Sequence, residues 1–75
     1  MNRREYITME EIRKCLYDSY KMMYEDAIKQ MRFCLRCAKL RREIGRMGWA
    51  ADWLEKANVM YKLARSYKRT MEIYS

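Results

Sequence analysis

The residues with the clearest chemical potential are six basic side chains spaced three or four positions apart. They are Lys29, Arg32, Arg36, Lys39, Arg42 and Arg46, and we call them the basic ridge. Because an α-helix turns about every 3.6 residues, this spacing places them along one flank of a helix. Positive charge repeated on a rigid support can follow the phosphates of a nucleic acid or clamp a nucleotide, and arginine forks suit phosphate oxygens. An ordinary solvated helix face, or one that meets an acidic protein, has the same pattern.

The net charge of the chain points in the same direction. The 75 residues carry a formal charge of +7. Residues 27–47 hold seven basic residues and one acidic residue, which gives this segment alone +6. A charge so unevenly placed indicates an anionic partner near that segment.

Catalytic and metal-binding chemistry finds little support. The chain has no His, so no imidazole base is available to a Cys or Ser nucleophile, and Gly45 and Gly48 alone do not make a phosphate-binding loop. The pair Cys34 and Cys37 has helical spacing, but the three cysteines of the chain are one ligand short of a structural zinc site. We therefore expect a non-enzymatic protein with no metal and no other cofactor; a zinc ion shared by Cys34 and Cys37 of two copies is the alternative.

A second set of residues has the chemistry of a protein interface. Partly buried phenol rings suit wet interfaces, and methionine makes such surfaces adaptable. The set, which we call the predicted interface set, comprises Ile12, Leu16, Tyr17, Tyr20, Met23, Tyr24, Tyr67, Met71 and Tyr74. It predicts contact between copies of the chain or with a partner protein; ordinary core packing and a base-stacking surface are the alternatives.

Two helices are expected to position these residues. The first runs from about Met9 to Ile44, because no Pro interrupts it and Thr8 with Glu11 forms a capping box at its start. Gly45 begins a turn over about 45–49. The second helix covers about 50–74, where apolar residues recur at spacings of three and four: Ala50, Trp53, Ala57, Met60, Ala64, Tyr67, Met71 and Tyr74. Its start is open, since Asp52 with Glu55 offers a capping box and Gly48 could cap an earlier start.

The fold predicted from these elements is a single all-α domain, 1–75, folded as an antiparallel helical hairpin. Pairing across the turn puts Ala27 near Tyr67, and Met31 and Cys34 near Ala64 and Met60, so that large side chains meet small ones. The second helix is too short to cover the segment 9–19. Either the first helix bends near Asp18 and Ser19 to make a three-helix bundle, or a second copy covers the segment, and homo-oligomerisation is expected.

Two functions follow as hypotheses. The first is a cytoplasmic helical binding module that engages nucleic acid or a nucleotide through the basic ridge. The cytoplasmic location is expected because the residues after Met1 form no apolar leader and the odd number of cysteines indicates reduced thiols. The second is a protein-binding adaptor or inhibitor, like compact accessory proteins of phages and plasmids. It would place the exposed apolar residues Ile12, Leu16, Tyr17 and Met23 in a groove of its partner.

Overall fold

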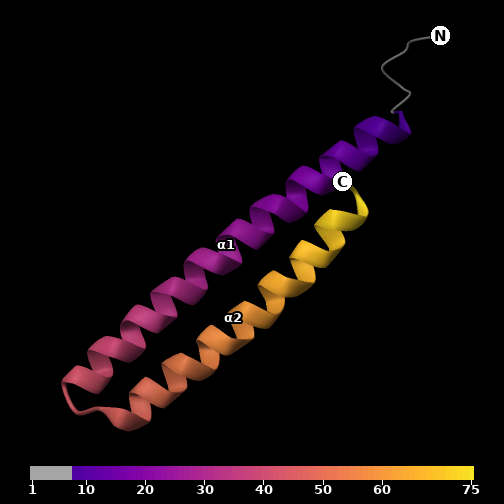
Figure 1. Cartoon of the computed structure of the whole chain (residues 1–75). Coiled ribbons are helices and arrows are strands. Elements are labelled where there is room, and N and C mark those ends of the chain that lie inside the picture. Colours follow the sequence, from indigo (N-terminus) through magenta and orange to yellow (C-terminus); the bar gives the residue numbers. More distant parts are fainter. Residues whose placement is uncertain (1–7) are drawn as a thin grey trace.

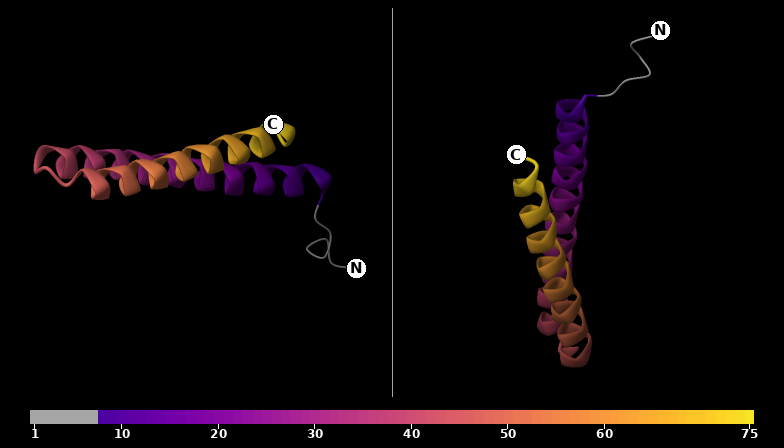
Figure 2. Two further views of the ribbon diagram at one scale, coloured as in Figure 1. Left: turned by 90° about the horizontal axis from the view of Figure 1, so that it is seen from below. Right: turned by 90° about the vertical axis from the view of Figure 1, so that its right-hand side faces the viewer.

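The chain folds as an antiparallel pair of helices. The structure is a computed structural model and describes residues 8–75. Residues 1–7, on which the expectation of no apolar leader rests, lie outside the described range. Helix α1 spans Met9–Glu43 and helix α2 spans Met47–Ile73, and the two lie side by side along the length of α2 (Figures 1 and 2). The predicted hairpin is confirmed, and α1 runs without a break through Asp18 and Ser19.

Helix α1 begins where the capping residues predict. The side-chain hydroxyl of Thr8 accepts a hydrogen bond from the Glu11 backbone N–H at 3.1 Å. Such an N-cap stabilises a helix by about 1 kcal/mol because it satisfies a donor that has no partner within the helix. Glu10 and Glu11 place negative charge in the first turn, where the helix dipole favours it.

The turn between the helices is shorter than predicted. Gly45 adopts a left-handed backbone with φ +80°. The Arg46 N–H donates to the Arg41 carbonyl at 2.7 Å and the Gly45 N–H donates to the Arg42 carbonyl at 3.1 Å. These are the two hydrogen bonds of a Schellman motif with Gly45 as the residue after the C-cap, and they satisfy carbonyls that the end of α1 leaves free.

Helix α2 starts before the predicted residue 50, on the side of the earlier start that the sequence leaves open. The Arg46 carbonyl accepts from the Ala50 N–H at 2.9 Å, so helical bonding resumes at once and α2 starts at Met47. Gly48 therefore lies inside α2, and the capping box of Asp52 and Glu55 marks no helix start.

Small side chains form the centre of the hairpin. The buried residues of the described range are three on α1 and three on α2, namely Ala27, Cys34, Ala38, Ala50, Ala57 and Ala64. Two of the predicted neighbours agree with the structure: Ala27 and Tyr67 border one groove, and Cys34 and Met60 border another. Alanine at these places lets the helices approach closely. In the described range no large side chain is fully buried, so one hairpin by itself has a thin core.

The open end of the hairpin is closed by aromatic rings. Tyr20 packs against Tyr67 and Tyr74, with ring centroids 6.2 and 6.1 Å away. Tyr74 also shares a surface groove with Tyr17 and Arg13, which lie nearer the start of α1. The part of α1 that extends beyond α2 is therefore shorter than the predicted 9–19.

Candidate nucleic-acid interface

All six residues of the basic ridge are exposed. Arg36 lies nine positions after the buried Ala27, which is about two and a half helical turns, so it points away from α2. Lys29 and Arg32 flank that direction. Five ridge residues belong to α1, whereas Arg46 lies just beyond its end and precedes the first residue of α2. From Lys29 to Arg36 the ridge thus follows the outer side of α1, and it ends at the turn.

Part of the ridge leans towards one broad side of the hairpin. Arg32 follows Ile28 by one helical turn, and Arg42 follows Leu35 by two. Ile28 borders a groove between the helices, and the groove's other wall belongs to α2. The ridge therefore adjoins a surface to which α2 contributes.

On this same side, α2 presents a basic cluster that the sequence analysis missed. The cluster consists of Lys62, Arg65, Lys68 and Arg69, which border the groove of Tyr24 and Ile28 or the shallow hollow next to it. Glu72 is the acidic residue in that groove. In the sequence these four cations are interspersed with apolar residues such as Ala64 and Tyr67. For this reason the sequence analysis did not recognise that they lie on one side of α2. The structure therefore adds positive charge from α2 to that of the ridge.

Arg46 is held at the turn by an aromatic ring. The Cζ atom of Arg46 lies 5.2 Å from the centroid of Trp49, and the Cζ atom of Arg41 lies 5.0 Å from it. Arg41 and Arg46 occupy the two positions at which a Schellman motif commonly has a hydrophobic contact. Here both guanidinium groups lie over the ring of Trp49, in place of an apolar contact with each other. The Trp49 side chain stays 52% exposed.

The predicted interface set is divided between the inside and outside of the hairpin. Tyr20, Tyr67 and Tyr74 pack on one another within one chain. The remaining members differ in exposure: Leu16, Tyr17, Tyr24 and Met71 are half-buried, whereas Ile12 is 39% and Met23 is 41% exposed. A role of this set in contact between subunits stays a prediction.

Cys34 is buried in the helix interface and Cys37 is half-buried beside it. Across residues 8–75, no cluster of three or more Cys, Asp or Glu is arranged to hold a metal ion. Over the same range, neither α1 nor α2 contains a stretch long and apolar enough to cross a membrane.

The chain matches no family model, no curated protein and no solved structure. Function is therefore inferred from the geometry and charge of this chain.

Proposed function

We propose that the protein is a non-enzymatic helical module that binds nucleic acid through the basic ridge. The observation that supports this most directly is that all six ridge residues are exposed on a rigid helix and its turn, and that Lys29, Arg32 and Arg36 lie on the side away from the core. Apart from Arg46, which lies over Trp49 at the turn, the ridge side chains take no part in the contact between the helices, whose buried residues are Ala and Cys. Their charge is available to phosphates.

The length of the ridge favours a polymer over a single nucleotide. Lys29 and Arg42 are thirteen residues apart on α1, which is about 20 Å at the helical rise. One strand of B-DNA presents a phosphate about every 3.4 Å along the axis, so several phosphates span that length. A nucleotide site also needs a concave wall, and the surface grooves described above include no ridge side chain.

The test uses two double variants that change the charge equally. Lys29→Gln with Lys39→Gln removes two cations from the ridge. Lys14→Gln with Lys21→Gln removes two equally exposed cations from the part of α1 outside the ridge. Binding to a labelled oligonucleotide is measured by fluorescence anisotropy over a range of salt concentrations.

We expect the unmodified protein to lose roughly a thousandfold in affinity between about 50 and 200 mM salt, as proteins with about six phosphate contacts do. The ridge variant should bind roughly tenfold more weakly, with a salt slope shallower by about 2, whereas the other pair should change little. Equal losses of affinity in the two variants would mean that binding depends on net charge alone, and the ridge would be rejected as the binding surface. Absence of binding to DNA or RNA at low salt would contradict the proposal. Tight binding of a mononucleotide would indicate that the ligand is a nucleotide and not a nucleic acid.

A protein-binding adaptor or inhibitor is the second candidate function. The exposed fractions of Ile12 and Met23 favour it, because apolar side chains on one flank of a helix can lie in a groove of a partner. Capture of partners from lysate with and without nuclease separates the two functions. A partner that survives nuclease treatment and is lost in Ile12→Glu with Met23→Glu supports the adaptor.

A further inference from the structure

Both helices carry a second apolar stripe beside the one that joins them. On α1 it contains Met23, Phe33, Cys37, Leu40 and Ile44. On α2 it contains Trp49 and Leu63 and shares Trp53, Met60, Tyr67 and Tyr74, all half-buried, with the seam that joins the helices. With the intervening polar positions Asp26, Gln30, Lys56 and Thr70, each series advances in steps of three and four residues. That is the spacing of a helix surface that packs on another helix by coiled-coil geometry. We call these residues the second apolar stripe.

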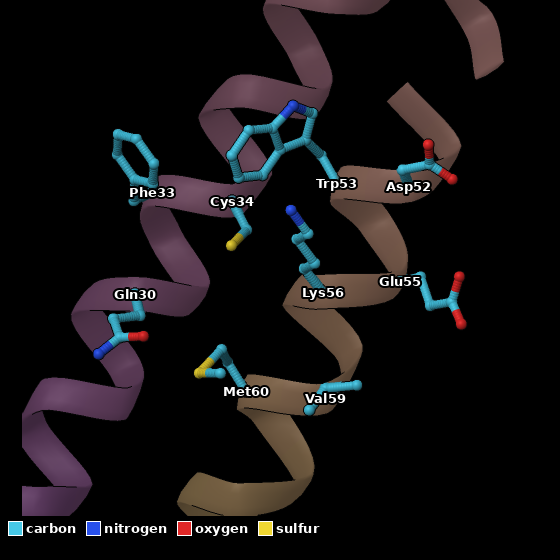
Figure 3. Close-up of a pocket in the computed structure, with 9 residues that line it drawn as sticks. All are labelled: Gln30, Phe33, Cys34, Asp52, Trp53, Glu55, Lys56, Val59 and Met60. Carbon is cyan, nitrogen blue, oxygen red and sulfur yellow. The ribbon is translucent and has the colours of Figure 1, made fainter. Parts of the chain in front are cut away.

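The two halves of the second apolar stripe lie on the same side of the hairpin. Phe33 of α1 meets Trp53 of α2 edge to face, with ring centroids 5.9 Å apart. The same two residues and Met60 border a groove of about 630 Å³ between the helices (Figure 3). Met23 and Leu63 border the next groove along the hairpin. The stripe is therefore one continuous surface across both helices, on the side opposite the groove of Tyr24 and Ile28.

Within residues 8–75, much of this surface is left uncovered. Phe33 is 51% exposed and Leu40 is 60% exposed, and Ile44 and Trp49 are exposed to a similar extent. The groove in Figure 3 is open along its side, since its wall residue Val59 is 54% exposed. In a four-helix bundle each helix packs on two neighbours through two adjacent stripes. Here both stripes are present on each helix and only one of them is filled.

We propose that a second copy of the chain covers the second apolar stripe and that the two hairpins form a four-helix bundle. The charge of the surface favours a copy of itself. The chain carries +7, yet the charged residues within the stripe or beside it balance. The bases are Arg41 and Arg46, which lie over Trp49, and Lys56; the acids are Asp26, Asp52 and Glu55, which border the grooves on this side. Two hairpins that repel each other elsewhere can approach through this neutral side.

The size of the surface also fits a dimer. Helix α2 has 27 residues and is about 40 Å long, and two packed helices are about 20 Å wide. Their shared side therefore covers about 800 Å², which is the area that each partner buries in a stable interface of standard size. This inference goes beyond the nucleic-acid proposal and can fail or hold without it.

The test compares two pairs of leucines on opposite sides of the hairpin. Leu40 and Leu63 belong to the second apolar stripe. Leu35 and Leu54 lie on the other side, two turns from Ile28 and Tyr61 of the opposite groove. Each pair has one leucine from α1 and one from α2, and all four are exposed. Changing either pair to glutamate alters the net charge by the same amount.

Sedimentation equilibrium at several protein concentrations measures the mass in solution, and circular dichroism confirms that each variant is helical. We expect the unmodified protein at twice the mass of the 9.3 kDa chain. Leu40→Glu with Leu63→Glu should give a monomer, and Leu35→Glu with Leu54→Glu should stay dimeric. A monomeric unmodified protein at high micromolar concentration would overturn the proposal, as would dissociation of the second variant alone.

A measurement on the unmodified protein covers the case in which the first variant does not fold. Cys37 lies in the second apolar stripe and is half-buried in one hairpin. Its alkylation, followed by mass spectrometry, should slow as protein concentration rises through the range where the dimer forms. A Cys37 rate that does not depend on concentration would contradict the bundle.

Discussion

The ring of Tyr20 stacks on that of Tyr74, with centroids 6.1 Å apart and an angle of 18° between the ring planes. Tyr74 is the residue at the C-cap of α2, and Tyr20 lies in the first half of α1. The contact therefore joins the end of the chain to the helix it pairs with. It extends the hairpin beyond its last buried alanine pair.

Loss of this stacked pair should weaken the hairpin. Tyr74→Ala is expected to lower the free energy of unfolding by about 1 kcal/mol, because an aromatic pair contributes about 0.5–1.5 kcal/mol beyond the area it buries. Urea denaturation followed by circular dichroism, at one protein concentration, measures the change. Tyr74→Phe keeps the ring and should stay close to the unmodified protein. If Phe costs as much as Ala, the hydroxyl and not the stacked ring stabilises this end.

The two glycines should respond to alanine in opposite directions. Gly45 has φ +80°, a backbone that a side chain disfavours, so Gly45→Ala should lower the free energy of unfolding by about 1 kcal/mol. Gly48 lies in α2 with nothing within 4 Å of an added Cβ, so Gly48→Ala should raise it by about 0.5 kcal/mol. Thermal unfolding of both variants gives the signs. A stabilised Gly45→Ala would mean that the turn is not the one described.

The small side chains between the helices should not tolerate enlargement. Ala64 is 1% exposed and faces α1, so Ala64→Leu should cost about 1–3 kcal/mol through overpacking. Ala51→Leu makes the same chemical change at an exposed position of α2 and should stay within about 0.5 kcal/mol. Chemical denaturation of the pair checks the difference. Equal effects would indicate that the helices are not held as closely as these alanines imply.

Sequence patterns predicted the hairpin because its signals are local or strictly periodic. Thr8 caps α1 through the predicted bond to Glu11, and Ala57 and Ala64 are buried as their spacing requires. The start of α2 was not identified because the pattern of Asp52 and Glu55 shows only that capping hydrogen bonds could form there. It does not show that a helix begins there. The Arg46 carbonyl resumes helical bonding first, and by Asp52 the helix is already formed.

Which residues share a surface of the hairpin was harder to predict than which residues form its core. The basic ridge could be predicted because five of its six residues belong to one helix. The α2 cluster around Arg65 and the second apolar stripe around Phe33 and Trp53 became apparent only when two helices were placed together. On α2 four residues of the stripe were already recognised as apolar positions of the seam, whereas on α1 Asp26 and Gln30 separate Met23 from Phe33, so the stripe there is not recognised as an apolar helix face from the sequence.

The turn at Gly45 also has a consequence for the order in which the molecule forms. Contacts beside it, such as those near Ala50, close a short loop, whereas the pair Tyr20 and Tyr74 closes a loop of most of the chain. The entropy lost on closing a loop grows with its length. The helix contacts should therefore form first beside Gly45 and last at Tyr20 and Tyr74, and on unfolding they should be lost in the reverse order. Backbone amides of α2 near Tyr67 should therefore exchange their hydrogens with solvent sooner than those near Ala57.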